Sequence, residues 1–147
     1  KDMSSHVAVD TSILENYQKN YRISRNDHSM AMLLKINLKE MKLEVEEEYR
    51  EPDTTLEAIA EELEESNPRF IVYSYKWVRS DKYGDRKQFP INLIYYTPEG
   101  SNPINSMVYT RTKAVLLDKF LGIQRSYDVR DKDTLSDKWL LGMLNKA

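Results

Sequence analysis

The sequence predicts a single α/β domain with a mixed β-sheet. Helical and strand-like apolar patterns interleave along the chain, and no linker, repeat or low-complexity segment separates them. The length of 147 residues fits one domain, because a chain of roughly 150 residues buries about 68–70% of its unfolded surface in one core. We therefore expect one domain over residues 1–147, with a mobile N-terminal tail at residues 1–8 and a cloning remnant at residues 1–2.

The chain begins with a predicted helix and a buried strand. Asp10 and Thr11 suit a helix cap. Residues at helical spacing follow and predict a helix over Thr11–Arg22, namely Leu14, Tyr17 and Tyr21. The run Met30–Ile36 is continuously apolar except for one lysine, which is typical of a strand buried on both faces.

A half-exposed strand and a short helix are predicted next. Leu43–Tyr49 nearly alternates, so its glutamates are expected to face water. Thr54 and Glu57 form a predicted capping box. The helix behind it has an apolar stripe and ends at Asn67-Pro68; the stripe is Leu56, Ile59 and Leu63.

The middle of the chain predicts a long hairpin. Phe70–Trp77 is aromatic and β-branched, as strands are, and Ile91–Tyr96 is the strand that follows. The segment Ser80–Lys87 between them predicts a charged loop.

The last third predicts a long helix, a strand and a final helix. Met107–Leu121 contains good helix formers and stops at Gly122. Gln124–Val129 predicts the last strand. Asp133-Thr134 is the predicted cap of a helix that buries Leu135, Trp139, Leu140, Met143 and Leu144.

The charge of the chain is nearly balanced but unevenly distributed. There are 22 Lys+Arg against 24 Asp+Glu, a net charge of −2, which argues against a strongly basic nucleic-acid binder. Leu38–Ser66 contains 12 acidic and three basic residues, so this segment carries −9 and the remainder carries +7. Such a division indicates either a solvated acidic flank or a basic side offered to an acidic partner.

The sequence contains no pattern typical of an enzyme, a metal site or a cofactor site. The four glycines stand alone, which excludes a glycine-rich phosphate loop, and there is no cysteine. His6 and His28 have no metal-ligand spacing. The pairs Glu61-Glu62 and Glu64-Glu65 fit the wet face of an amphipathic helix. No apolar run approaches the roughly 20 residues of a membrane span.

The long helix has apolar and basic residues on two sides. Arg111 is expected to share one side with Val108, Val115 and Lys119. The other side is expected to hold Tyr109, Lys113, Leu116 and Phe120. One side can pack on the sheet while the other, apolar and basic, recognises the cleft of a partner protein.

Several segments together resemble the glia maturation factors, a branch of the actin-depolymerising-factor homology (ADF-H) fold. Pro68–Tyr75 resembles the signature strand of this family, and Met107–Lys113 resembles its long-helix motif, which usually reads Met-Met-Tyr-Ala-Gly-Ser-Lys. Further similar segments are Lys19–Arg22, Ala31–Ile36, Thr134-Leu135 and Trp139-Leu140. The resemblance implies a cofilin-like α/β (α+β) fold, a six-stranded mixed sheet flanked by helices on both faces.

The resemblance also implies a function. Glia maturation factors bind the actin-related protein 2/3 complex, inhibit branched actin nucleation and debranch filaments. The implied protein is a cytoplasmic monomer of cortical branched-actin structures, with the nucleus as a second location. It is not an enzyme, needs no cofactor or metal, and binds neither nucleic acid nor membrane.

Two surfaces follow from the resemblance. The first, the N-terminal tail plus the long helix, would enter the groove of an actin-related subunit; its residues are Met3, Ser4, Ser5, Arg22, Met107, Arg111 and Lys113. The second, the hairpin loop plus the last helix, would touch the first actin of the daughter filament; its residues are Asp81, Lys82, Arg86, Lys87, Asp137 and Lys138. Ser4 or Ser5 stands where the family is phosphorylated, and a phosphate there adds about −1.5 to −2 charge.

Three differences from related motifs affect the assignment. Thr110-Arg111 replaces two small residues, and the longer cation either strengthens the contact with an acidic groove or crowds it. The hairpin loop is more charged and longer than usual. Ile104 and Ser106 stand where cofilins carry lysines, which favours the nucleator-binding branch over the alternative, a cofilin-type protein that binds and severs actin.

Overall fold

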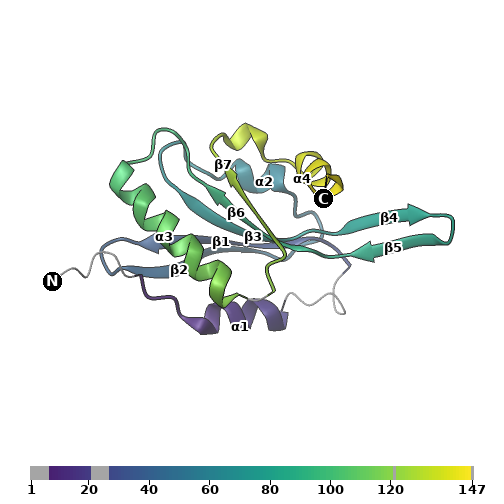
Figure 1. The fold of residues 1–147 in the computed structure, drawn as a ribbon, viewed down its shortest axis with the longest axis horizontal. Helices are drawn as coiled ribbons and strands as arrows, with labels where there is room; N and C mark the ends of the chain where they lie inside the picture. The colour runs from purple at the N-terminus through teal and green to yellow at the C-terminus, as the bar shows by residue number, and fades with distance from the viewer. Residues whose placement is uncertain (1–6, 21–26, 121, 147) are drawn as a thin grey trace.

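The computed structural model describes residues 7–20, 27–120 and 122–146. Helices and strands alternate along these ranges (Figure 1). In chain order they are α1 (Thr11–Asn20), β1 (Met30–Asn37), β2 (Lys42–Tyr49), α2 (Leu56–Ala60), β3 (Arg69–Ser74), β4 (Trp77–Asp81), β5 (Gly84–Gln88), β6 (Ile91–Tyr96), α3 (Pro103–Lys119), β7 (Arg125–Val129), the 3₁₀ turn η2 (Lys132–Thr134) and α4 (Asp137–Asn145).

The main sheet is mixed, as predicted. Its order is β2-β1-β3-β6-β7, and all neighbours are antiparallel except the parallel pair β6 and β7. The expected count of six strands is wrong for the described residues, where the main sheet has five. Strands β4 and β5 form a separate two-stranded ribbon, and Ala8 adds only one parallel bridge to Lys42 beside β2.

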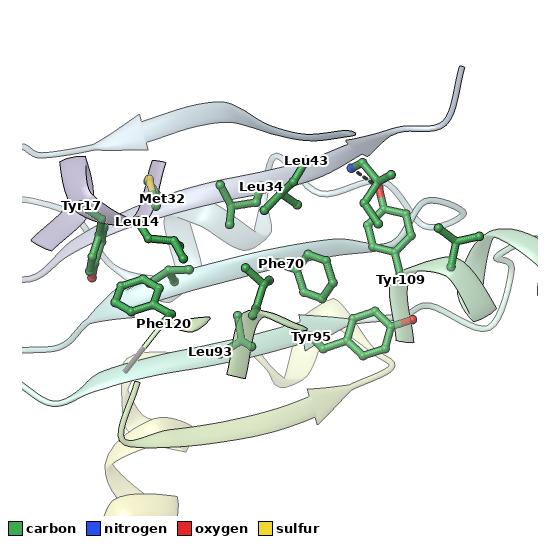
Figure 2. Packing of buried hydrophobic residues seen from close by; sticks show 14 of the residues in the cluster. Leu14, Tyr17, Met32, Leu34, Leu43, Phe70, Leu93, Tyr95, Tyr109 and Phe120 are labelled. Carbon is green, nitrogen blue, oxygen red and sulfur yellow. Dashed lines mark hydrogen bonds between the residues drawn. The ribbon is translucent and has the colours of Figure 1, made fainter. Parts of the chain in front are cut away.

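Helices cover both faces of the sheet, because side chains of successive strand residues point to opposite faces. Met32, Phe70 and Tyr95 pack on one face against α1 and α3 (Figure 2). Ala31 and Ile71, each next in sequence to one of these, pack on the other face against α2 and α4. The two clusters make a three-layer α/β domain and confirm the predicted fold class.

Aromatic contacts fix α1 and α3 on their face of the sheet. The rings of Tyr17 in α1 and Phe120 at the end of α3 meet edge to face, with centroids 5.4 Å apart. Phe70 lies 5.3 Å from the ring of Tyr95 and 5.3 Å from that of Tyr109. Pairs of this kind contribute about 0.5–1.5 kcal/mol each beyond the area that they bury.

Two predicted helix caps are displaced in the structure. The side chain of Thr55, not Thr54, caps α2 by accepting a hydrogen bond from Ala58 N, because the Thr54 hydroxyl donates to Glu51 O. Ser136, not Asp133-Thr134, caps α4 through Trp139 N. Glu57 accepts from the backbone N–H of Asp137 instead of completing a capping box.

The boundaries of other elements also differ from the predictions. Helix α2 ends at Ala60, well before Asn67-Pro68, and α3 begins at Pro103 rather than Met107. The charged loop expected at Ser80–Lys87 is wrong, because these residues belong almost entirely to β4 and β5. The predicted end of the first helix at Arg22 lies outside the described residues.

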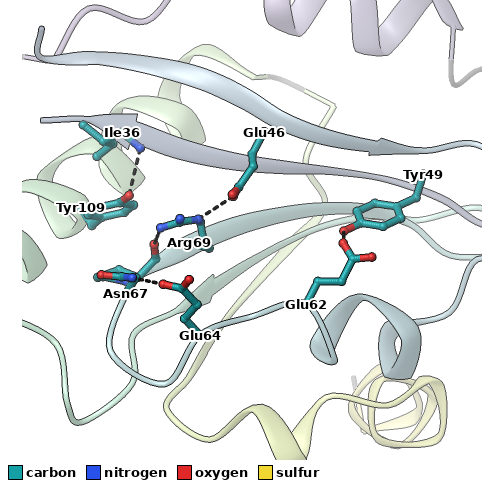
Figure 3. A network of polar contacts seen from close by, with 9 residues as sticks. Ile36, Glu46, Tyr49, Glu62, Glu64, Asn67, Arg69 and Tyr109 are labelled. Carbon is teal, nitrogen blue, oxygen red and sulfur yellow. Dashed lines mark hydrogen bonds and ion pairs between the residues drawn. The ribbon is translucent and has the colours of Figure 1, made fainter.

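Glu46 of β2 has a partner two strands away in the sheet. The β1–β2 register shifts at Leu33/Leu34, so Glu46 has no partner residue on β1. Its carboxylate accepts from Arg69 Nε on β3 at 2.7 Å (Figure 3). The expectation that this side chain only faces water is therefore wrong.

Candidate partner-binding surfaces

Helix α3 has one buried face and one exposed face. Val108, Tyr109, Thr112 and Leu116 are buried against the sheet. The expected placement of Val108 beside Arg111 is wrong, because it lies roughly 60° round the helix from Arg111, toward the sheet. Arg111 itself is exposed.

Hydrogen bonds hold α3 in a fixed position on the sheet. Asn102 caps its first turn by accepting from Ile104 N and Asn105 N. The Tyr109 hydroxyl accepts from Ile36 N at 2.9 Å (Figures 2 and 3), and the Tyr95 hydroxyl donates to Ser106 O at 3.1 Å. The outer face of α3 is therefore presented by a rigid element.

That outer face carries more apolar surface than the sequence indicated. Met107 is 53% exposed, as a partner-contact residue should be. Ile104 is 71% exposed and Leu117 is 38% exposed, and neither was assigned to the surface from sequence. The signal for Ile104 was the Asn102-Pro103 cap, which starts the helix one turn earlier than predicted. Exposed apolar side chains along one helix face are typical of protein–protein contacts.

The structure brings only some members of the first predicted surface together. Met107 and Arg111 line one groove of about 790 Å³, together with Arg130. Two acidic residues, Glu99 and Asp128, line the same groove. Lys113 is not a lining residue, but its ammonium donates to the Asp128 carboxylate on β7 at 2.7 Å. The remaining members, Met3, Ser4, Ser5 and Arg22, lie outside the described residues.

The second predicted surface starts on the β4–β5 ribbon, which projects from the body of the molecule (Figure 1). Arg86 pairs with Asp81 at 3.4 Å across the ribbon. Lys87 pairs with Asp27 at 3.0 Å. At the tip, the ammonium of Lys82 lies 5.2 Å from the ring of Tyr83, which is 86% exposed.

Helix α4 joins this surface with its last turn, not its first. Leu144 and Asn145 line a groove with the base of the ribbon. Lys138 is exposed in the first turn, but Asp137 points inward. The Asp137 carboxylate accepts from Leu56 N at 3.1 Å and from the Tyr73 hydroxyl at 2.8 Å, so it connects α4 to α2 and β3.

The burial of Asp137 affects its titration. Desolvation raises the pKa of this carboxyl above its ordinary value, and the nearby Glu57 carboxylate adds to the effect. The hydrogen bonds from Leu56 N and Tyr73 oppose it by favouring the charged form. Asp137 therefore has a role inside the fold.

In residues 7–20, 27–120 and 122–146, no three His, Cys, Asp or Glu side chains gather as a metal site would require. None of the helices in these ranges combines the length and apolar character needed to cross a bilayer. The two grooves, one lined by Met107 and Arg111 and the other by Arg79 and Arg125, are the candidate sites.

Comparison with known proteins relates the chain to a family. The family model described as "Cofilin/tropomyosin-type actin-binding protein" matches residues 6–145. Glia maturation factor of Drosophila melanogaster is 31% identical over 97% of this chain and 99% of its own length. Glia maturation factor beta of Mus musculus is 29% identical over 90% of this chain and 88% of its length. The solution structure of the Caenorhabditis elegans glia maturation factor superposes with a TM-score of 0.75 at 28% identity, covering 93% of this chain and 94% of that one.

Proposed function

Because this chain belongs to the glia maturation factors, within the cofilin/tropomyosin-type actin-binding protein family, we propose that it binds the actin-related protein 2/3 complex. In this proposal the chain is a monomeric regulator of the actin cytoskeleton that inhibits branched nucleation and promotes debranching. It acts in the cytoplasm, at cortical branched actin, and does so without catalysis.

The outer face of α3 is the observation that carries the proposal. Ile104, Met107 and Arg111 stand on one side of a helix whose opposite side is anchored to the sheet. A partner groove that is apolar with an acidic rim would be complementary to this face. Met3, Ser4, Ser5 and Arg22 extend the surface in the proposal, and a phosphate on Ser4 or Ser5 would weaken binding to such a rim.

The second surface supports debranching in the same proposal. The exposed cations Lys82, Arg86 and Lys138 would face the first actin subunit of a daughter filament. Asp137 is left out of this surface, because its carboxylate is engaged by Leu56 and Tyr73.

A nucleation assay tests the proposal. Pyrene-actin assembly driven by the complex and an activator should slow when the protein is added. The double variant Met107→Ala/Arg111→Ala should need about 30-fold more protein for the same slowing, because each of the two truncations at the centre of an interface costs on the order of 1 kcal/mol. Lys113 is kept, since its loss would break the pair with Asp128.

A matched variant controls for folding and charge. Glu61→Ala changes one exposed charge directly after α2, the helix that packs on the face of the sheet opposite α3, and should inhibit like the parent. Unchanged assembly kinetics with the parent protein in large excess would refute the proposal. Tight co-sedimentation with pure filaments would instead favour the cofilin-type alternative.

A further inference from the structure

A cationic groove lies at the base of the β4–β5 ribbon. The ribbon, the start of β7 and the last turn of α4 enclose about 750 Å³ there. Three cationic residues line it, Arg79, Lys87 and Arg125, and none of the described lining residues is acidic. Lys87 is already paired with Asp27 at 3.0 Å, so Arg79 and Arg125 are the cations that a ligand would meet first. Trp77, Phe89 and Leu144 supply the apolar part of the wall.

Two glutamine side chains line the groove, Gln88 and Gln124. Gln88 Oε1 already accepts from Arg79 Nη1 at 3.3 Å, and Gln124 Oε1 accepts from Ile91 N at 3.0 Å. The NH₂ groups of both amides remain available as donors. Donors together with three cations fit a ligand rich in anionic acceptor oxygens.

A second and independent feature extends the positive charge along the ribbon. Arg79 and Arg86 are direct cross-strand partners, so their side chains share one face. Like charges placed opposite each other destabilise a strand pair. Arg79 partly avoids this by lying over the Trp77 ring, 4.5 Å from its centroid, and Arg86 has only the 3.4 Å contact with Asp81. An anion bridging the two guanidinium groups would remove the repulsion.

The remaining charges nearby do not neutralise this face. Asp27 is shared by Lys87 at 3.0 Å and Lys76 at 3.5 Å, so one carboxylate serves two ammonium groups. Asp85 is the register partner of Ser80, so its side chain lies on the ribbon face opposite Arg79 and Arg86, where the Ser80 hydroxyl donates to it. The described charged residues around the ribbon therefore leave an excess of positive charge.

We propose that the Arg79–Arg86 row and the groove at Arg125 bind an extended acidic peptide segment of a protein partner. The site is an open row rather than an enclosed pocket, which suits a chain segment better than a small ligand. Alternate residues of an extended peptide project to the same side about 6.6 Å apart. The same spacing separates Trp77 and Arg79, which are two residues apart on β4. Carboxylates on alternate peptide residues can therefore contact successive cross-strand pairs on this face of the ribbon.

The inference rests on the proposed function in one respect, that the partner is a protein. The proposed function did not specify what kind of partner segment the second surface contacts, and an acidic segment answers this. The ribbon groove and the Met107–Arg111 groove share no lining residue, although β7 contributes Arg125 to the first and Asp128 to the second.

A direct titration of the full chain tests the inference. The probe is a short fluorescent peptide of alternating aspartate and threonine, followed by polarisation and by amide chemical shifts. Binding should perturb the amides of Arg79, Gln88 and Arg125 and weaken as salt is added. Arg79→Ala/Arg125→Ala should weaken it at least about tenfold, whereas the equally charged control Lys39→Ala/Lys119→Ala, at exposed positions elsewhere, should not.

Two results of the peptide titration would overturn the inference. One is an equal loss of peptide affinity in both double variants, and the other is a set of amide chemical-shift changes confined to α3. Inorganic phosphate or anionic vesicles that bind through Arg79 and Arg125 more tightly than the peptide would overturn it in favour of a phosphate ligand. The titration contains no nucleator, so failure here with intact nucleation inhibition leaves the proposed function standing. Lost inhibition with retained peptide binding refutes only the proposed function.

Discussion

Asp137 shows how a single residue can be assigned to the wrong place from sequence. A charged residue in the first turn of a helix is usually at the surface, and its sequence context gives no sign of burial. In the structure the Asp137 carboxylate instead receives the N–H of Leu56 and the hydroxyl of Tyr73, residues far away in the chain. Only the tertiary packing of α4 on α2 and β3 could reveal this role.

We predict that Asp137 makes the stability of the domain depend on pH. Its folded-state pKa is raised, so the folded protein binds this proton more readily than the unfolded chain. The resulting stability is fully present below the unfolded pKa of about 3.9 and is lost as pH rises through the folded value. Compared with Asp137→Asn, the parent should therefore gain stability as pH falls from 7 to about 4. The gain should stay below about 1 kcal/mol, because solvent still reaches the group.

Urea unfolding of both proteins at several pH values measures this difference. Asp118→Asn, which removes an exposed carboxylate from α3, controls for the change in net charge. A parent-minus-variant difference that stays flat between pH 4 and 7 would contradict the assignment.

At the scale of elements, burial decides what the sequence could predict. Strands β1, β3 and β6 are buried along nearly their whole length, so their continuous apolar runs predicted them as strands. In β4 and β5 all residues except Trp77 are exposed, so no apolar period marked them. The ribbon depends on backbone pairing and on a turn in which Gly84 has φ +114° and Asp81 accepts from Tyr83 N.

The same contrast holds for the candidate surfaces. Met107 and Arg111 could be assigned from the helix motif, whereas Ile104 depended on where the helix begins. Arg79 and Arg125 carry no motif, because they belong to separate strands that only the fold brings together. Of the residues that line the ribbon groove, only Lys87 was assigned to a partner surface from the sequence, whereas on the exposed face of α3 both Met107 and Arg111 were assigned.

We predict that Tyr109 contributes to stability through its hydroxyl group. The β1–β3 register ends at Leu34↔Phe70, so no β3 residue pairs with β1 at Ile36. The Tyr109 hydroxyl accepts from the Ile36 N–H instead. Tyr109→Phe should lower the free energy of unfolding by about 1–3 kcal/mol, because a buried N–H loses its acceptor.

Chemical denaturation measures this loss, and Tyr83→Phe is the matched control because that ring is 86% exposed. The control should be neutral within about 0.5 kcal/mol. Equal stability of Tyr109→Phe and the parent would mean that water satisfies the Ile36 N–H.

At the scale of the whole molecule, the two charged portions of the chain occupy different places. The acidic segment Leu38–Ser66 forms edge strand β2 and helix α2. Helix α2 covers the face of the sheet opposite α3, so the acidic residues of α2 lie away from Met107 and Arg111. Glu46 of β2 lies near Tyr109 of α3, and its charge is paired with Arg69. A net charge of −2 therefore conceals an asymmetric field that would orient a partner toward the basic side.

This asymmetry has a cost in stability that can be measured. Exposed carboxylates of β2 and the following turn line one groove of about 480 Å³ beside α2, and they include Glu47, Glu51 and Asp53. Mutual repulsion among them should be relieved by the triple variant Glu47→Gln/Glu51→Gln/Asp53→Asn. We expect its free energy of unfolding to rise by about 0.5–1 kcal/mol at low salt. The gain should vanish near 1 M salt, where the Debye length is about 3 Å.

A second triple variant separates local repulsion from net charge. It removes three exposed carboxylates from the basic remainder of the chain, Glu15→Gln, Glu99→Gln and Asp118→Asn. Both variants change net charge from −2 to +1, but the second removes negative charge where positive charge is in excess, so its stability should stay level or fall at low salt. If both variants gain the same free energy of unfolding, net charge alone governs stability, and the separation of acidic and basic residues into two regions has no effect on it. A gain of the first variant that persists in 1 M salt would also reject the explanation, because repulsion between exposed groups cannot survive that screening.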